Sequence, residues 1–147
     1  MSIYEVIAIV ISAVGIVISI ISLIKVHKAD KISQGQIELN IHQLISGTKK
    51  DVLDLTLMVT EKLSSDQEKT KEILNQALES AKEQNLNAYE EACAKYLDNK
   101  VDKERFKKNY IIEIRQLVER NSDKYNTTSP YKATLKVYNE WNNLEGK

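Results

Sequence analysis

Residues 6–24 read VIAIVISAVGIVISIISLI, a run of nineteen positions without a charged side chain. As an α-helix with a rise of about 1.5 Å per residue, this run would be roughly 29 Å long, which is close to the roughly 30 Å hydrocarbon core of a bilayer. A strand of this length would be unusual, and inside a bilayer every backbone amide has to be bonded within its own segment. The sequence therefore predicts a transmembrane helix within residues 1–27.

The charges beside this run predict its orientation. Glu5 precedes it without any lysine or arginine, whereas Lys25, Lys28 and Lys31 follow it. A secretory signal peptide would have a basic N-terminal region and a shorter apolar core, so we expect an uncleaved anchor. Positive charge stays on the cytoplasmic side. We therefore predict a single-pass protein of the bacterial inner (plasma) membrane, with its N-terminus outside and its C-terminal part in the cytoplasm, a reducing compartment that suits the single Cys93 as a core residue.

The rest of the chain is balanced in charge and helical in pattern. The 21 basic and 21 acidic residues predict no strong general attraction to nucleic acid. One proline and four glycines argue against a fold rich in sheet and turns. We expect an all-α protein with a membrane-proximal helical stalk over residues 28–64 and a small cytosolic helical domain over residues 65–147.

Apolar residues at steps of three and four define the expected helices. In the stalk they are Ile37, Ile41, Leu44, Thr48, Val52, Leu55 and Val59, with a hinge expected near Gly35 or Gly47. Ser65 to Glu68 has the pattern of a capping box, and residues 66–98 form either one helix or two. Asp102 is the expected N-cap of a helix whose core face includes Phe106, Tyr110 and Ile114. Pro130 precedes a last helix that contains Trp141.

Small residues recur along one side of the apolar run. They are Ala8, Ser12, Gly15, Ser19 and Ser22, at alternating steps of four and three. Helices in lipid associate through close packing of small residues, so this seam predicts a homo-oligomer, as a closed bundle or around a serine-lined pore. The alternative is that the hydroxyls bond to the preceding turn of a single helix.

A basic strip lies beside the core face of the helix that follows Asp102. Its residues are the candidate ligand-binding residues Arg105, Lys108, Arg115 and Arg120. A guanidinium matches phosphate oxygens with two parallel hydrogen bonds, so the strip suits an anionic ligand. The alternative is a solvated helix face that alternates with glutamates. The two histidines and the single cysteine do not have metal-ligand spacing, and we expect no catalytic site, metal or cofactor.

The layout resembles that of small membrane-anchored effectors of bacterial anti-phage defence. The chain has a short span, a helical stalk, and a compact domain that holds YEEACAKYLD at residues 89–98 and DKERF at residues 102–106. It is most similar in size and layout to the membrane effector of type III CRISPR systems that responds to cyclic tetra-adenylate. The resemblance implies an oligomer whose cytosolic domain binds a cyclic oligonucleotide and whose spans then perturb the membrane.

We therefore expect an oligomeric single-span membrane effector that senses an anionic signal, with cyclic oligoadenylate as the candidate. Its partners would be the lipid bilayer, further copies of the chain and the cyclic oligonucleotide. The alternative is a membrane-tethered helical adaptor that binds a protein partner. An adaptor predicts an apolar surface patch, whereas the effector predicts a basic pocket.

Overall fold

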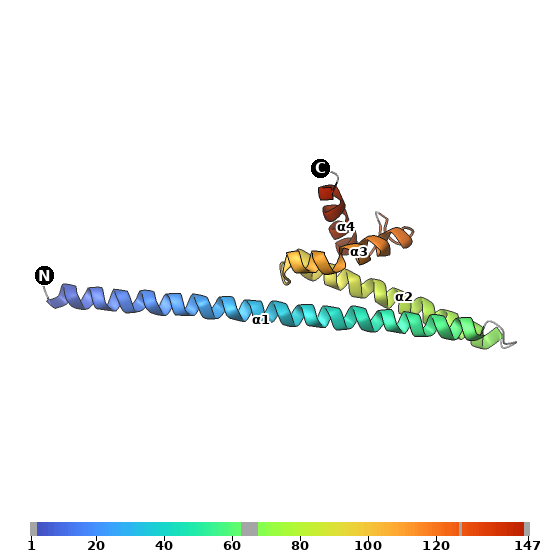
Figure 1. Cartoon of the computed structure of the whole chain (residues 1–147), viewed down its shortest axis with the longest axis horizontal. Helices are drawn as coiled ribbons and strands as arrows, with labels where there is room; N and C mark the ends of the chain where they lie inside the picture. Colours follow the sequence, from blue (N-terminus) through green and yellow to red (C-terminus); the bar gives the residue numbers. More distant parts are fainter. Residues whose placement is uncertain (1–2, 63–67, 127, 146–147) are drawn as a thin grey trace. The chain divides into compact units, whose positions relative to one another are not determined.

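The computed structural model describes residues 3–62, 68–126 and 128–145, apart from the side chains of residues 5–11, 13, 62, 68 and 143–145. These residues form four helices, α1 (Ile3–Lys62), α2 (Glu68–Leu97), α3 (Lys103–Arg120) and α4 (Lys132–Glu145) (Figure 1). Every regular element in these ranges is a helix, which confirms the predicted all-α class.

Helix α1 is continuous over 60 residues. It runs through Lys25, Gly35 and Gly47, so neither glycine ends the helix. By its internal contacts the chain divides into two compact units, Met1–Gln36 and Ile37–Lys147. The boundary therefore falls inside a helix rather than in a loop.

The predicted transmembrane helix is wrong. Within the part of the chain that the structure describes, no helix combines the length and the apolar composition needed to cross a membrane. The uncharged stretch whose side chains are described runs from Val14 to Ile24. Ala8 of the predicted seam lies outside the described side chains.

In the second unit, α2 runs back along the later part of α1 and the two form a helical hairpin (Figure 1). Residues at steps of four and three turn inward on each helix. They are Ile41, Ile45, Thr48, Val52, Leu55 and Val59 on α1 and Leu74, Leu78, Ala81, Asn85, Ala88 and Ala92 on α2. This spacing is that of a coiled-coil seam. One polar pair crosses it, because the Thr48 hydroxyl donates to Asn85 Oδ1 at 3.0 Å.

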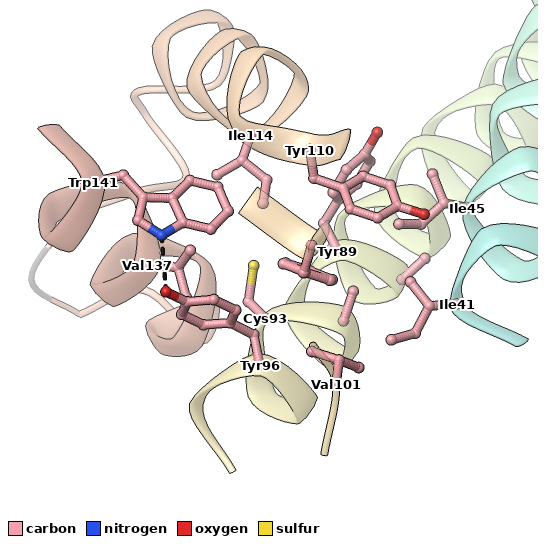
Figure 2. Close-up of a cluster of buried hydrophobic side chains, with 13 residues drawn as sticks. Ile41, Ile45, Tyr89, Cys93, Tyr96, Val101, Tyr110, Ile114, Val137 and Trp141 are labelled. Atoms are coloured by element: carbon pink, nitrogen blue, oxygen red, sulfur yellow. Dashed lines mark hydrogen bonds between the residues drawn. The ribbon is translucent and has the colours of Figure 1, made fainter. Parts of the chain in front are cut away.

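Aromatic side chains close the core between the hairpin, α3 and α4 (Figure 2). The ring centroid of Tyr96 lies 5.4 Å from those of both Phe106 and Trp141. Trp141 Nε1 donates to the Tyr96 hydroxyl at 3.1 Å, so both polar atoms remain bonded inside the core. Cys93 is 0% exposed among these residues, which confirms its predicted core position.

The turn between α2 and α3 is built by local capping. Asn99 has φ 58°, and the amides of Asn99 and Lys100 donate to the Tyr96 and Lys95 carbonyls at 3.2 and 2.9 Å. These two bonds with a left-handed residue form a Schellman motif. Asp102 then accepts from the Arg105 amide at 3.0 Å, which confirms the predicted N-cap. The predicted cap at Ser65 lies outside the described residues, whereas α2 is a single helix.

Helix α4 receives its N-terminal cap from another helix. The Glu90 carboxylate on α2 accepts from the Ala133 and Thr134 amides at 2.8 and 2.9 Å, and from the Thr134 hydroxyl at 2.9 Å. Ser129 Oγ accepts from the Tyr131 amide at 3.0 Å just before the helix. Amides in a first helical turn have no partner within the helix, so Glu90 bonds groups that would otherwise be unpaired.

Candidate functional site

The structure places the four predicted basic residues on more than one side of α3. Arg105 is engaged within the chain, since its Nε lies 2.6 Å from Glu38 Oε2 and its Nη2 donates to Glu38 Oε1 at 2.9 Å. This hydrogen-bonded ion pair raises the pKa of the Arg105 guanidinium. The same Glu38 accepts from the Asp102 amide at 2.9 Å, so the α1 carboxylate holds the start of α3.

The other three basic residues do not gather at one point. Lys108 is exposed and Arg115 is half-buried. At 3.6 residues per turn, Arg120 lies about 140° around the helix from Arg115. Arg120 instead lines a pocket that it shares with α1 and α2 residues. The predicted strip is therefore divided, with Arg105 and Arg120 on the side of α1.

The pocket at Arg120 has a volume of about 320 Å³. Its lining comprises Lys49, Asn85, Tyr89, Glu113, Gln116, Leu117, Arg120 and Asn121. Glu113 contacts two other lining residues of this pocket. Its carboxylate accepts a hydrogen bond from the Tyr89 hydroxyl at 2.7 Å and forms an ion pair with Lys49 Nζ at 2.8 Å. Burial raises the pKa of the Tyr89 phenol, and the hydrogen bond to Glu113 raises it further. The sequence did not indicate this cluster, because its members come from three helices and share no spacing.

Two separate cavities lie along the hairpin of α1 and α2. One, of about 220 Å³, is lined by Ile37, Asn40, Ile41, Leu44, Glu91 and Lys95. The other, of about 330 Å³, is lined by Asp51, Asp54, Leu55, Ala77, Ser80, Ala81 and Gln84. Both cavities are lined by α1 and α2 residues, without any from α3 or α4 among the described residues.

The first unit carries a long exposed apolar surface, Val14 to Ile24, which we call the apolar run. Its large apolar side chains are each between 49% and 70% exposed. Within the predicted seam, Ser19 Oγ donates to the Gly15 carbonyl at 2.9 Å. A Cβ atom built on Gly15 would meet nothing within 4 Å. No contact with a described residue of the chain therefore requires glycine at this position.

Comparison with known proteins identifies no relative. No protein-family model matches the chain, and no curated protein or solved structure matches it. The resemblance to anti-phage effectors, the cytoplasmic location of residues 65–147 and the lipid, oligonucleotide and protein partners therefore stay predictions.

Proposed function

We propose that the chain is a homo-oligomeric helical adaptor. In this proposal the apolar run of α1 joins copies of the chain, and the unit Ile37–Lys147 is the domain that the assembly presents to its binding partners. The observation that carries the proposal is the exposure of the apolar run. A helix that is apolar on every side is stable where other apolar groups surround it. Contiguous exposed apolar surface also marks protein interaction sites.

The small residues of the seam support copies of the chain as the surrounding groups. Ser12, Gly15, Ser19 and Ser22 would let neighbouring backbones approach closely, while the isoleucines and valines beside them would supply apolar contact. The Ser19 hydroxyl already donates to the Gly15 carbonyl, so its burial in such an interface would leave no unbonded donor. Gly15 would then be required by the neighbouring copy, since glycine inside a helix costs about 1 kcal/mol relative to alanine.

Paired substitutions in the full chain test this association. Gly15→Ile adds bulk on the seam, whereas the matched control Val14→Ile adds one methylene beside it. We expect the original chain and Val14→Ile to form the same oligomer in mild detergent, and Gly15→Ile to dissociate. Light scattering after size-exclusion chromatography would measure the masses. The same oligomeric mass for all three chains would contradict association through the seam.

The pocket at Arg120 supports a second candidate function, the sensing of an anionic ligand. Lys49 and Arg120 reach this pocket from different helices, and an anion that replaces Glu113 at Lys49 would contact both cations. A guanidinium–phosphate contact is a charge-assisted hydrogen bond, which contributes about 1.5–3 kcal/mol.

Calorimetric titration of the full chain with cyclic tetra-adenylate, and with the linear form as a control, tests this candidate. We expect Arg120→Ala to weaken binding about tenfold or more and Lys108→Ala, which lies away from the pocket, to leave it unchanged. Equal losses in both variants, or no binding to the original chain, would contradict a site at Arg120.

A further inference from the structure

In the pocket at Arg120, a single carboxylate oxygen is shared by two donors from different helices. Glu113 Oε2 on α3 accepts from the Tyr89 hydroxyl of α2 at 2.7 Å and lies 2.8 Å from Lys49 Nζ of α1. A phenol and an ammonium around one oxygen are donors of the kind that phosphate oxygens also accept. The donors are therefore already arranged around an anion, and that anion is a side chain of the protein itself.

The pocket contains further donors that Glu113 does not engage. Arg120 lines it and has no ion-pair partner among the residues that the structure describes. Asn85 Oδ1 accepts from the Thr48 hydroxyl at 3.0 Å, so the amide nitrogen of Asn85 is left as the donor for a ligand. Burial raises the pKa of the Tyr89 phenol, which keeps its hydroxyl protonated as a donor. A ligand that replaces Glu113 would therefore gain contacts that this carboxylate does not make.

The ion pair of Glu113 is open to exchange with such a ligand. The side chains of Lys49 and Glu113 are 44% and 39% exposed, and an ion pair this accessible to water contributes little to stability. Glu113 still competes with dissolved anions, because a group held in the same chain acts at a high effective concentration. A single charge that contacts only Lys49 would replace one carboxylate with its equivalent, whereas a phosphate ligand that also reaches Arg120 would gain a second cation.

We propose that Glu113 is a built-in competitor that sets which anions the pocket at Arg120 accepts. The inference rests on the second candidate function, the sensing of an anionic ligand, and adds how the site selects that ligand. Glu113 occupies Lys49 and Tyr89, so single carboxylates are excluded, and a ligand with clustered phosphate charge binds by contacting Lys49 and Arg120 together. A volume of about 320 Å³ suits a small phosphate ligand or the phosphate part of a larger one.

Calorimetric titration of the full chain with inorganic pyrophosphate tests this role. Glu113→Gln keeps an acceptor for the Tyr89 hydroxyl but releases Lys49, so we expect it to bind pyrophosphate about tenfold more tightly than the original chain. Glu119→Gln is the matched control, since it removes the same charge from an exposed α3 residue outside the pocket lining, and it should bind as the original chain does. The emission of Trp141 would confirm that each variant is folded.

A second pair of variants separates competition for Lys49 from simple charge repulsion by Glu113. On a Lys49→Gln background, Glu113→Gln should give little of the gain, because there is no ammonium to release. Repulsion alone would give the same gain on both backgrounds and would overturn the competitor role.

Two further ligands define the selectivity. Excess acetate should leave pyrophosphate bound to the original chain, and its displacement by acetate would overturn the proposal. Titration with cyclic tetra-adenylate distinguishes the source of the phosphate. A gain in Glu113→Gln for pyrophosphate alone assigns the pocket to a free polyphosphate, and a gain for both ligands assigns it to phosphate groups in general.

The outcomes also separate this inference from the function on which it rests. Equal binding of pyrophosphate by the original chain and by Glu113→Gln would overturn the competitor role and leave an anion site in place. Absence of binding in both chains would overturn the anion site and the competitor with it.

Discussion

Replacing Glu90 with glutamine is expected to lower the free energy of unfolding by about 2–3 kcal/mol. The carboxylate of Glu90 accepts three hydrogen bonds, from two amides of the first turn of α4 and from the hydroxyl of the fully buried Thr134. Hydrogen bonds to a charged group contribute about 1.5–3 kcal/mol each. Glutamine keeps one acceptor oxygen, so some of these bonds remain in weaker, neutral form while at least one donor loses its partner.

Unfolding in urea, followed by the fluorescence of Trp141, would measure this loss. Trp141 is the one tryptophan of the sequence and is 2% exposed in the core, so its emission reports on the unit Ile37–Lys147. Glu83→Gln is the control, because Glu83 is an exposed glutamate of the same helix. For a unit of this size, the expected loss corresponds to a decrease in Tm of about 8–12 °C. Equal midpoints for Glu90→Gln and Glu83→Gln would refute the capping role.

Three further outcomes are expected. Burial and the hydrogen bond to Glu113 raise the pKa of Tyr89 above its ordinary 10.0. The neutral phenol therefore favours the folded state below pH 10, and this stability is lost as the pH rises further. Urea unfolding across this pH range should show a weaker pH dependence in Tyr89→Phe. Burial raises the pKa of the Cys93 thiol to about 12. An aromatic disulfide reagent should therefore label Cys93 only at the rate at which the domain opens. Fast labelling of the folded chain would contradict the burial of Cys93. Asn99→Val should lower the free energy of unfolding in urea by about 1–2 kcal/mol because φ is positive at this position, whereas Asn99→Gly should leave it unchanged. Equal effects of the two substitutions would contradict the Schellman turn.

The helical periodicity of the later chain was a reliable guide to its fold. Phe106, Tyr110 and Ile114 are buried on one face of α3, as their spacing predicted, and Asp102 caps that helix. These features depend on residues close in sequence, so a local pattern contains the information. The same logic missed Val137 and Thr134, which are fully buried on α4, because their exposure depends on α2.

The candidate site was harder to predict from the sequence than the helices were. The spacing of Arg105 and Lys108 suggested one basic strip, but Glu38 lies 67 residues before Arg105 and engages its guanidinium. The pocket at Glu113 likewise joins residues of three helices. The prediction of a transmembrane helix took an uncharged run as sufficient, whereas no helix among the described residues meets the requirement for a span.

The carboxylates that bind the starts of α3 and α4 also bear on how the chain folds during its synthesis. Glu38 lies 64 residues before the Asp102 amide that it binds, and Glu90 lies 43 residues before the Ala133 amide. Each acceptor is therefore synthesised well before its donors, and the bond from the Asp102 amide forms only once the hairpin presents Glu38. Contacts between distant residues form slowly because a long loop has to close first. The nascent chain consequently keeps its aromatic core incomplete until the last helix, with Trp141, leaves the exit tunnel.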